Sequence, residues 1–157
     1  MTVQDQIKIL QVGHEQSAVH PAYGYYRVSA KSLPVFTSIG SGALNTAIGL
    51  GESYVASTAV SVISGEAHTY MEDRGVLQEL ERKRPADIPS ALEPLAKASY
   101  RPRSHQALHY DLNNTFEQMT TGRPDRAFIS LPIDVQAESG DVTVSVIVNA
   151  SAFGKFE

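Results

Sequence analysis

Short apolar runs and amphipathic stretches alternate along most of the chain. The apolar runs predict buried strands at residues 7–12, 34–37, 59–63, 98–101 and 126–131. Between them, apolar residues recur at i, i+3 and i+4, which is typical of helices packed on a core. Strands that alternate with helices predict an α/β fold with a doubly wound, mostly parallel sheet. Ligands bind outside the carboxyl ends of the strands in such sheets, so the turns after the strands are the first place to look for chemistry.

Three stretches carry the clearest helical pattern, at residues 16–30, 43–54 and 104–120. Pro21 lies inside the first helix and is expected to kink it or to bound a short first turn. The second helix is rich in small residues, which allow close packing against a neighbour. In the third, Ser104 is placed to cap the amino end, and a glycine follows the carboxyl end.

The remaining segments are less regular. Residues 76–84 predict a further helix, and two prolines interrupt residues 88–98. Residues 142–148, VTVSVIV, alternate in polarity and predict a separate strand without an identifiable neighbour. We therefore divide the chain into a domain of residues 1–138 and a C-terminal strand or linker segment of residues 139–157.

Length and composition fit one globular domain. The 157 residues are 42% apolar and 19% charged, which is enough apolar sequence to bury a core and does not predict disorder. No apolar run is long enough to span a membrane, and the opening MTVQDQ lacks the build of a signal peptide, so the cytoplasm is the expected location. A chain without cysteine has no disulfide, thiol nucleophile or cysteine-bound zinc. The net charge of −4 argues against a nucleic-acid partner.

A series of short motifs accompanies these predicted elements. In chain order they are His14-Glu15-Gln16, Gly24-Tyr25-Tyr26-Arg27, the turn TSIGSGALN from Thr37 to Asn45, Ile63-Ser64-Gly65, Leu77-Gln78-Glu79, Thr121-Gly122-Arg123-Pro124 and Leu131-Pro132-Ile133-Asp134-Val135. In this order and spacing they resemble the pyrimidine-binding, N-terminal domain of thiamine diphosphate-dependent enzymes. The resemblance is to the acetolactate synthase group above all, and also to the trihydroxycyclohexanedione hydrolase type. It covers residues 7–138.

The resemblance implies a cofactor and a reaction class. Thiamine diphosphate serves as an electron sink when a carbon–carbon bond next to a carbonyl is cleaved or formed, typically in a 2-keto acid. The resemblance assigns to Glu15 the carboxyl that hydrogen-bonds the pyrimidine ring and favours its imino tautomer. Such a carboxyl must share a proton near neutral pH, so burial is expected to raise its pKa. By residue type alone, Glu15 would be a glutamate favoured at a helix N-terminus by the helix dipole.

Four further positions are assigned to the cofactor site by the same resemblance. Ser41, Gly42 and Asn45 lie in the turn after the second strand, which lines the pyrimidine pocket in similar enzymes. Gln78 matches a glutamine that faces the active site across a subunit interface. The family usually has proline where this chain has Ser41. Asn45 is also suited to a local helix cap, and Gln78 to an exposed helical position.

Parts of the longer family members are missing from this sequence. Those enzymes bind the diphosphate through Mg²⁺ in a second domain with G-D-G and N-N motifs, and no G-D-G occurs here. The strand-helix unit that usually precedes the H-E-Q segment is also missing, which would leave a sheet edge exposed. We therefore expect binding of the pyrimidine end only, and no activity alone. Activity would need a diphosphate-binding domain or subunit in a homo- or hetero-oligomer.

Other interpretations stay open beside this one. The chain could be a non-catalytic binding or assembly module, a truncated relic, or an unrelated flavodoxin-like domain. A dinucleotide-binding turn is disfavoured because Asn45 replaces the third glycine of the fingerprint. His105 and His109 have the spacing of a zinc site, but a glutamine stands where the general base would be. Glu66 and His68 are expected on a loop at the carboxyl edge, where they could face substrate.

Overall fold

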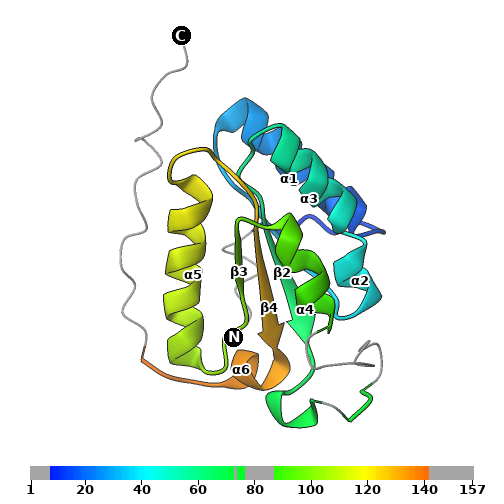
Figure 1. Cartoon of the computed structure of the whole chain (residues 1–157), viewed down its shortest axis with the longest axis vertical. Helices are drawn as coiled ribbons and strands as arrows, with labels where there is room; N and C mark the ends of the chain where they lie inside the picture. Colours follow the sequence, from blue (N-terminus) through cyan, green and yellow to red (C-terminus); the bar gives the residue numbers. More distant parts are fainter. Residues whose placement is uncertain (1–7, 73, 77–86, 142–157) are drawn as a thin grey trace.

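The computed structural model of the chain describes residues 8–72, 74–76 and 87–141. Within these residues four strands form one sheet, and every neighbouring pair is parallel. The strand order is β1-β2-β4-β3, so β2 and β4 are central while β1 and β3 lie at the edges (Figure 1). The strands are β1 (Pro34–Thr37), β2 (Ser61–Glu66), β3 (Ala98–Tyr100) and β4 (Ala127–Pro132). The predicted α/β fold with a parallel sheet is confirmed.

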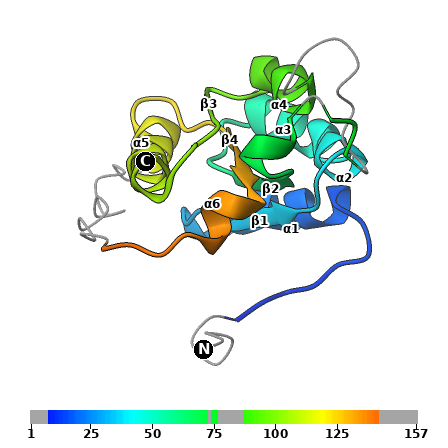
Figure 2. The ribbon, with the colours of Figure 1, turned by 90° about the horizontal axis from the view of Figure 1, so that it is seen from below.

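Helices cover the sheet on both faces, and the coverage is unequal (Figure 2). They are α1 (Gln16–Ser29), α2 (Ser41–Leu44), α3 (Ala47–Val55), α4 (Asp87–Leu92), α5 (His105–Thr120) and α6 (Ile133–Ala137), with the short 3₁₀ helices η1 (Thr69–Met71) and η2 (Glu93–Leu95). The larger core cluster joins α1, α2, α3 and α4 to one face of the sheet. The smaller cluster joins α5 to the other face.

The strand register explains which side chains meet each layer. Val35, Val62 and Phe128 form one row across β1, β2 and β4, and all three are buried under α1 to α4. The next row contains Phe36 and Ile129, which face α5 because successive strand residues point to opposite faces. Ile129 is buried, but Phe36 is 70% exposed because α5 packs on β3 and β4 and leaves β1 uncovered.

The prediction of a strand at residues 7–12 is wrong for residues 8–12, the part of it that the structure describes. Residues 8–12 form no strand, and Ile9 and Leu10 are 67% and 75% exposed. An apolar run becomes a strand only when a neighbouring strand accepts its backbone hydrogen bonds. Here a groove separates the run from β1, which is the nearest sheet edge. Glu15 therefore follows an unpaired segment and not a strand.

The second predicted helix is divided in two. The structure has α2 and α3 with Asn45 and Thr46 between them. The Thr46 hydroxyl donates to the Ala43 carbonyl at 2.6 Å, a local side-chain bond of the kind that competes with a continuous helix. The expected close packing is present, since a Cβ on Gly49 would lie 2.5 Å from Val19 Cγ1 of α1.

Other boundaries are close to their predictions. Pro21 does not end α1, which continues through it to Ser29. The predicted cap of α5 is confirmed, because the Ser104 hydroxyl accepts from the Ala107 N–H at 3.2 Å. β2 extends to Glu66, beyond the predicted end at residue 63. Residues 77–84 of the predicted fourth helix and the predicted strand at 142–148 lie outside the described residues. Among the described helices, none is long and apolar enough to cross a membrane.

Candidate functional site

Glu15 is placed by the amino end of α1. Its carbonyl accepts hydrogen bonds from the N–H groups of Ala18, at 2.9 Å, and Val19, at 3.3 Å, so Glu15 is the residue from which the helix starts. The positive end of the helix dipole stabilises an anionic side chain at this position. The Glu15 carboxylate lies at the carboxyl edge of the sheet, beside the turn that follows β1.

Asn45 supplies the hydrogen bond that fixes this carboxylate. Its side-chain Nδ2 donates to Glu15 Oε2 at 2.9 Å. Asn45 ends α2, where its own N–H donates to the Ser41 carbonyl at 3.1 Å. Two residues that lie 30 positions apart in the sequence are thus joined at the ends of two helices. The Asn45 amide binds only Oε2, and no side chain among the described residues donates to Glu15 Oε1.

Gly42 permits the carboxylate to lie where it does. A Cβ at this position would be 3.0 Å from Glu15 Oε1 and 3.3 Å from the Ser38 Cβ, so these neighbours would have to shift by a few tenths of an ångström. The turn that delivers Gly42 needs a second glycine, because Gly40 has a φ of 69° in the left-handed region. The Ser64 hydroxyl donates to the Ser38 carbonyl at 3.1 Å and so ties this turn to β2.

The electrostatic surroundings keep Glu15 ionised. The amide of Asn45 is the main cause of a lowered Glu15 pKa, and a hydrogen bond from its own backbone N–H adds to it. Desolvation raises the pKa by less than these donors lower it, since the side chain is only partly buried. The expected upward shift of the Glu15 pKa is therefore wrong for this structure. A carboxylate that accepts hydrogen bonds prefers its charged form.

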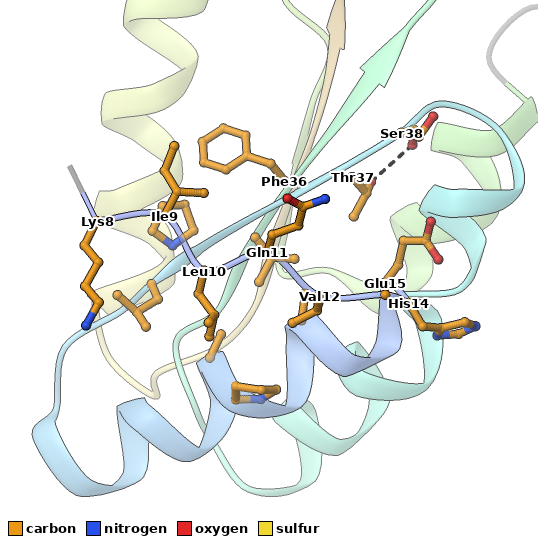
Figure 3. Close-up of a pocket in the computed structure, with 17 residues that line it drawn as sticks. Lys8, Ile9, Leu10, Gln11, Val12, His14, Glu15, Phe36, Thr37 and Ser38 are labelled. Carbon is orange, nitrogen blue, oxygen red and sulfur yellow. Dashed lines mark hydrogen bonds between the residues drawn. The ribbon is translucent and has the colours of Figure 1, made fainter. Parts of the chain in front are cut away.

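An elongated cleft leads away from this carboxylate (Figure 3). Its volume is about 550 Å³, and its two walls are residues 8–15 and residues 33–38. Three side chains of α1 line it between these walls, namely Ala18, Pro21 and Ala22. The lining is largely apolar along its length, with Glu15 and Ser38 at one end. Such a cleft suits a flat, partly apolar ligand with a polar edge.

The structure brings together three of the five predicted site residues: Glu15, Gly42 and Asn45. Ser41 begins α2 with an exposed side chain and contributes the carbonyl that holds the Asn45 N–H. Gln78 lies outside the described residues. The cleft wall at residues 8–12 was not predicted, because its apolar pattern was attributed to a strand of the sheet.

A second carboxylate, Glu66, is held differently. It is the last residue of β2 and only 4% exposed, although the sequence predicts a loop. Ser130 donates to its Oε2 at 2.6 Å, and Arg101 pairs with its Oε1. Arg101 also lies 3.1 Å from Glu72, which pairs with Arg103. Burial, with a smaller effect from Arg103, lowers the pKa of Arg101 to about 10.

The histidines of α5 make local contacts. Glu138 Oε2 lies 2.7 Å from the His105 backbone nitrogen and 3.0 Å from its Nδ1. The hydrogen bond from the His105 N–H is the main cause of a lowered Glu138 pKa. His109 Nε2 lies 3.3 Å from the Asn113 amide. In the part of the chain that the structure describes, no three His, Cys, Asp or Glu side chains gather to hold a metal ion. His68 contacts the ring of Tyr70, with centroids 5.0 Å apart.

Comparisons with known proteins agree with the resemblance. The sequence profile described as "Thiamine pyrophosphate enzyme, N-terminal TPP binding domain" matches residues 1–84, more than half of the chain. A probable acetolactate synthase large subunit of Methanocaldococcus jannaschii is 30% identical over 129 residues, which are 82% of this chain and 21% of that protein. The mitochondrial acetolactate synthase catalytic subunit of Saccharomyces cerevisiae is 29% identical over 133 residues, 85% of this chain and 18% of that protein. The chain thus spans about a fifth of the length of these relatives.

Proposed function

Because the chain belongs to the thiamine pyrophosphate enzyme family, as a member of its N-terminal TPP-binding domain, we propose that it binds the pyrimidine end of thiamine diphosphate at Glu15. We further propose that it does so as part of an acetolactate synthase-like enzyme that cleaves or forms carbon–carbon bonds in 2-keto acids. The observation that carries the proposal is the placement of the Glu15 carboxylate between the Asn45 amide and the backbone of Gly42.

The residues present fit the pyrimidine end of the cofactor. Glu15 offers a carboxylate oxygen at the end of an apolar cleft, and Asn45 fixes its other oxygen. Gly42 keeps space beside the carboxylate that a methyl group would fill. In this proposal Glu15, Gly42 and Asn45 hold the ring, and Ser41 and Gln78 add contacts that the family resemblance assigns to them. No such fit is offered for Mg²⁺, which we assign to a partner domain or subunit.

Thiamine diphosphate, when bound, supplies an electron sink for the bond next to a carbonyl. The task of Glu15 is to hold a proton at Oε1 and share it with a ring nitrogen of the ligand. The hydrogen bonds from the Asn45 amide and from the Glu15 backbone work against this in the free chain, because both lower the pKa of the carboxyl. A ring that displaces water from the cleft would raise that pKa again, so proton sharing is expected to depend on ligand binding.

The proposal includes a partner, because the aligned residues make up only 21% and 18% of the two relatives. We propose that a diphosphate-binding domain or subunit supplies the Mg²⁺ site and that the chain alone is inactive. The alternative is a non-catalytic binding or assembly module. In that alternative the cleft and the Glu15–Asn45 pair would serve binding without turnover.

Calorimetry separates these two functions. Thiamine diphosphate with Mg²⁺ is titrated into the chain alone and into the chain mixed with a separately expressed diphosphate-binding domain. We expect binding in the mixture that weakens by about tenfold or more in Glu15→Gln, the loss of a charge-assisted hydrogen bond. Glu52→Gln, an exposed position on α3, is the matched control and should bind as the unchanged chain does. No binding in either arrangement, from folded protein, would leave the assembly module.

A further inference from the structure

The β1–α2 turn, residues 38–40, delivers Gly42 and Asn45 to the Glu15 carboxylate. The turn itself contains no helix or strand, and α2, which follows it, has only four residues. A helix this short is unstable on its own in water, so it cannot fix the position of the residues that it carries. That position has to come from the element on which the turn rests.

The turn rests on the carboxyl end of β2. This strand is central in the sheet and has a parallel neighbour on each side, β1 and β4, so it is a firm support. The Ser64 hydroxyl, on a residue that is 2% exposed, donates to the Ser38 carbonyl at 3.1 Å across 26 positions of sequence. The same hydroxyl lies 3.0 Å from the Gly65 carbonyl, and the two carbonyls share its one hydrogen.

The next residue of β2 supports the turn from the other face. Successive strand residues point to opposite faces, so Gly65 presents the face of β2 away from the Ser64 side chain. A Cβ on Gly65 would lie 3.2 Å from Ile39 Cγ2 and 3.8 Å from the Ile39 backbone nitrogen. Ile39 therefore packs where a side chain at position 65 would begin. Ser64 and Gly65 hold the turn from both faces of one strand.

A short series of contacts leads from this support to the carboxylate. Ser38 adjoins Gly42, because a Cβ on Gly42 would be 3.3 Å from the Ser38 Cβ. The same Cβ would be 3.0 Å from Glu15 Oε1, so Gly42 adjoins the carboxylate as well. Asn45, three residues further along the chain, donates to Glu15 Oε2. A displacement of Ser38 is thus expected to change both contacts of the carboxylate.

We propose that Ser64 and Gly65 are positioning residues of the cofactor site, which fix the β1–α2 turn on the end of β2 and so set where Gly42 and Asn45 meet the Glu15 carboxylate. A site keeps a ligand in productive geometry only when the residues behind its contacts are themselves fixed. The consequence for cofactor binding rests on the proposed function. The effect on Glu15 is a property of the free chain and can be measured without cofactor.

Ser64→Ala tests the hydrogen bond, and Ser61→Ala is its matched control. Both serines lie on β2 and both are 2% exposed, but the Ser61 hydroxyl has no hydrogen-bond partner among the described residues. The chain with Ser64→Ala is expected to fold, because the Thr37 hydroxyl still donates to the Ser38 carbonyl at 3.2 Å (Figure 3). The substitution therefore removes the tie to β2 and leaves this carbonyl with a donor.

Carbon-detected NMR titration of the free chain measures the Glu15 pKa in both variants. We expect Ser64→Ala to raise this pKa toward the ordinary glutamate value, because the Asn45 amide that lowers it is displaced with the turn. Ser61→Ala should leave the Glu15 pKa unchanged. If Ser64→Ala lowers the free energy of unfolding in urea but leaves the Glu15 pKa where it is, Ser64 is only structural and the proposal is wrong.

Gly65→Ala tests the support from the other face. The new methyl group would displace Ile39, so we expect the Glu15 pKa to rise here too. In a chain that already carries Ile39→Ala, the same Gly65→Ala change should have no effect on the Glu15 pKa, because the contacting Cγ2 is gone. A Gly65→Ala effect of equal size in both backgrounds would mean that it does not act through the turn.

Calorimetry in the mixture with the diphosphate-binding domain measures the consequence for the cofactor. We expect Ser64→Ala to weaken thiamine diphosphate binding by about threefold or more, the net contribution of one hydrogen bond, and Ser61→Ala to bind as the unchanged chain does. Equal affinities in the two variants would contradict the positioning role. A Glu15 pKa that rises in a chain that never binds thiamine diphosphate would support the positioning of Glu15 and overturn the proposed function.

Discussion

Two glutamates at the carboxyl edge of one sheet have opposite surroundings. Glu15 is partly exposed, accepts one side-chain amide and lines a cleft. Glu66 is 4% exposed and has both carboxylate oxygens engaged, one by Ser130 and the other by Arg101. A buried carboxylate with all its partners supplied has nothing left for a ligand. The difference teaches that the carboxylate with spare bonding capacity, and not the more buried one, is the candidate for chemistry.

Glu66→Gln should have the largest effect on stability. The change removes the buried charge that Arg101 pairs with and leaves Glu72, 3.1 Å away, as its remaining carboxylate, so we expect a loss of about 2–3 kcal/mol. Urea unfolding measures the difference, with Glu15→Gln as the matched substitution at a partly exposed site. That control should change the free energy of unfolding by about 0.5 kcal/mol or less. Equal losses in the two variants would remove the contrast between the glutamates.

Gly42→Ala tests the Glu15 side of the comparison. The new methyl group would contact Glu15 Oε1 and the Ser38 side chain, so we expect a loss of about 1–2 kcal/mol and weaker cofactor binding. Gly51→Ala is the control, because a Cβ there meets nothing within 4 Å and alanine favours the helix by about 0.5–1 kcal/mol. Thermal unfolding of both variants gives the comparison. A neutral Gly42→Ala would mean that the carboxylate moves freely.

Asn45→Ala sharpens the electrostatic contrast. Since the amide is the main cause of the lowered Glu15 pKa, its removal should raise that pKa toward the ordinary glutamate value. A lowered folded-state pKa stabilises the fold above the unfolded-state pKa, and this contribution is lost as pH falls through the folded-state pKa. The acid loss of stability attributable to Glu15 should therefore shrink in the variant. Carbon-detected NMR titration of the Glu15 carboxyl reports the pKa. An unchanged value would assign the shift to the backbone alone.

Ser41→Ala should have the smallest effect. Its side chain is exposed, so the free energy of unfolding should change by about 0.5 kcal/mol or less. Its carbonyl, which holds the Asn45 N–H, is unaffected by the substitution. Cofactor affinity measured by calorimetry in the mixture decides whether the hydroxyl contacts the ligand. A loss as large as that of Glu15→Gln would place Ser41 beside Glu15 in importance.

The family resemblance assigned Glu15 and Asn45 to the same cofactor site, and the structure joins them by a hydrogen bond. The local rule that ligands bind after the strands was not sufficient for Glu15, because the run before it forms no strand. The pattern also located β1 and the cap of α5. The strand β1 and the cap of α5 depend on residues near one another in the chain. Local patterns were sufficient for them.

Features that depend on distant neighbours were missed. The run at residues 8–12 has the apolar residues of a strand but no strand beside it, which no local pattern can reveal. The partner of Glu66 is 35 positions away on the segment after β3, and the pairing requires β4 to lie between β2 and β3. The pKa direction of Glu15 was missed for a related reason. It depends on the Asn45 donor more than on burial.

One consequence of the cleft follows from the position of Glu15 in the wall itself. Residues 8–14, which form one wall of the cleft, continue directly into the residue whose carboxylate faces the ligand. The position of this wall and the occupation of the carboxylate are then coupled equilibria, and coupling is reciprocal. If thiamine diphosphate holds the wall in one position by some factor, then anything that holds the wall in that position tightens thiamine diphosphate binding by the same factor. The position of the wall and the affinity for the cofactor are two measurements of one free energy.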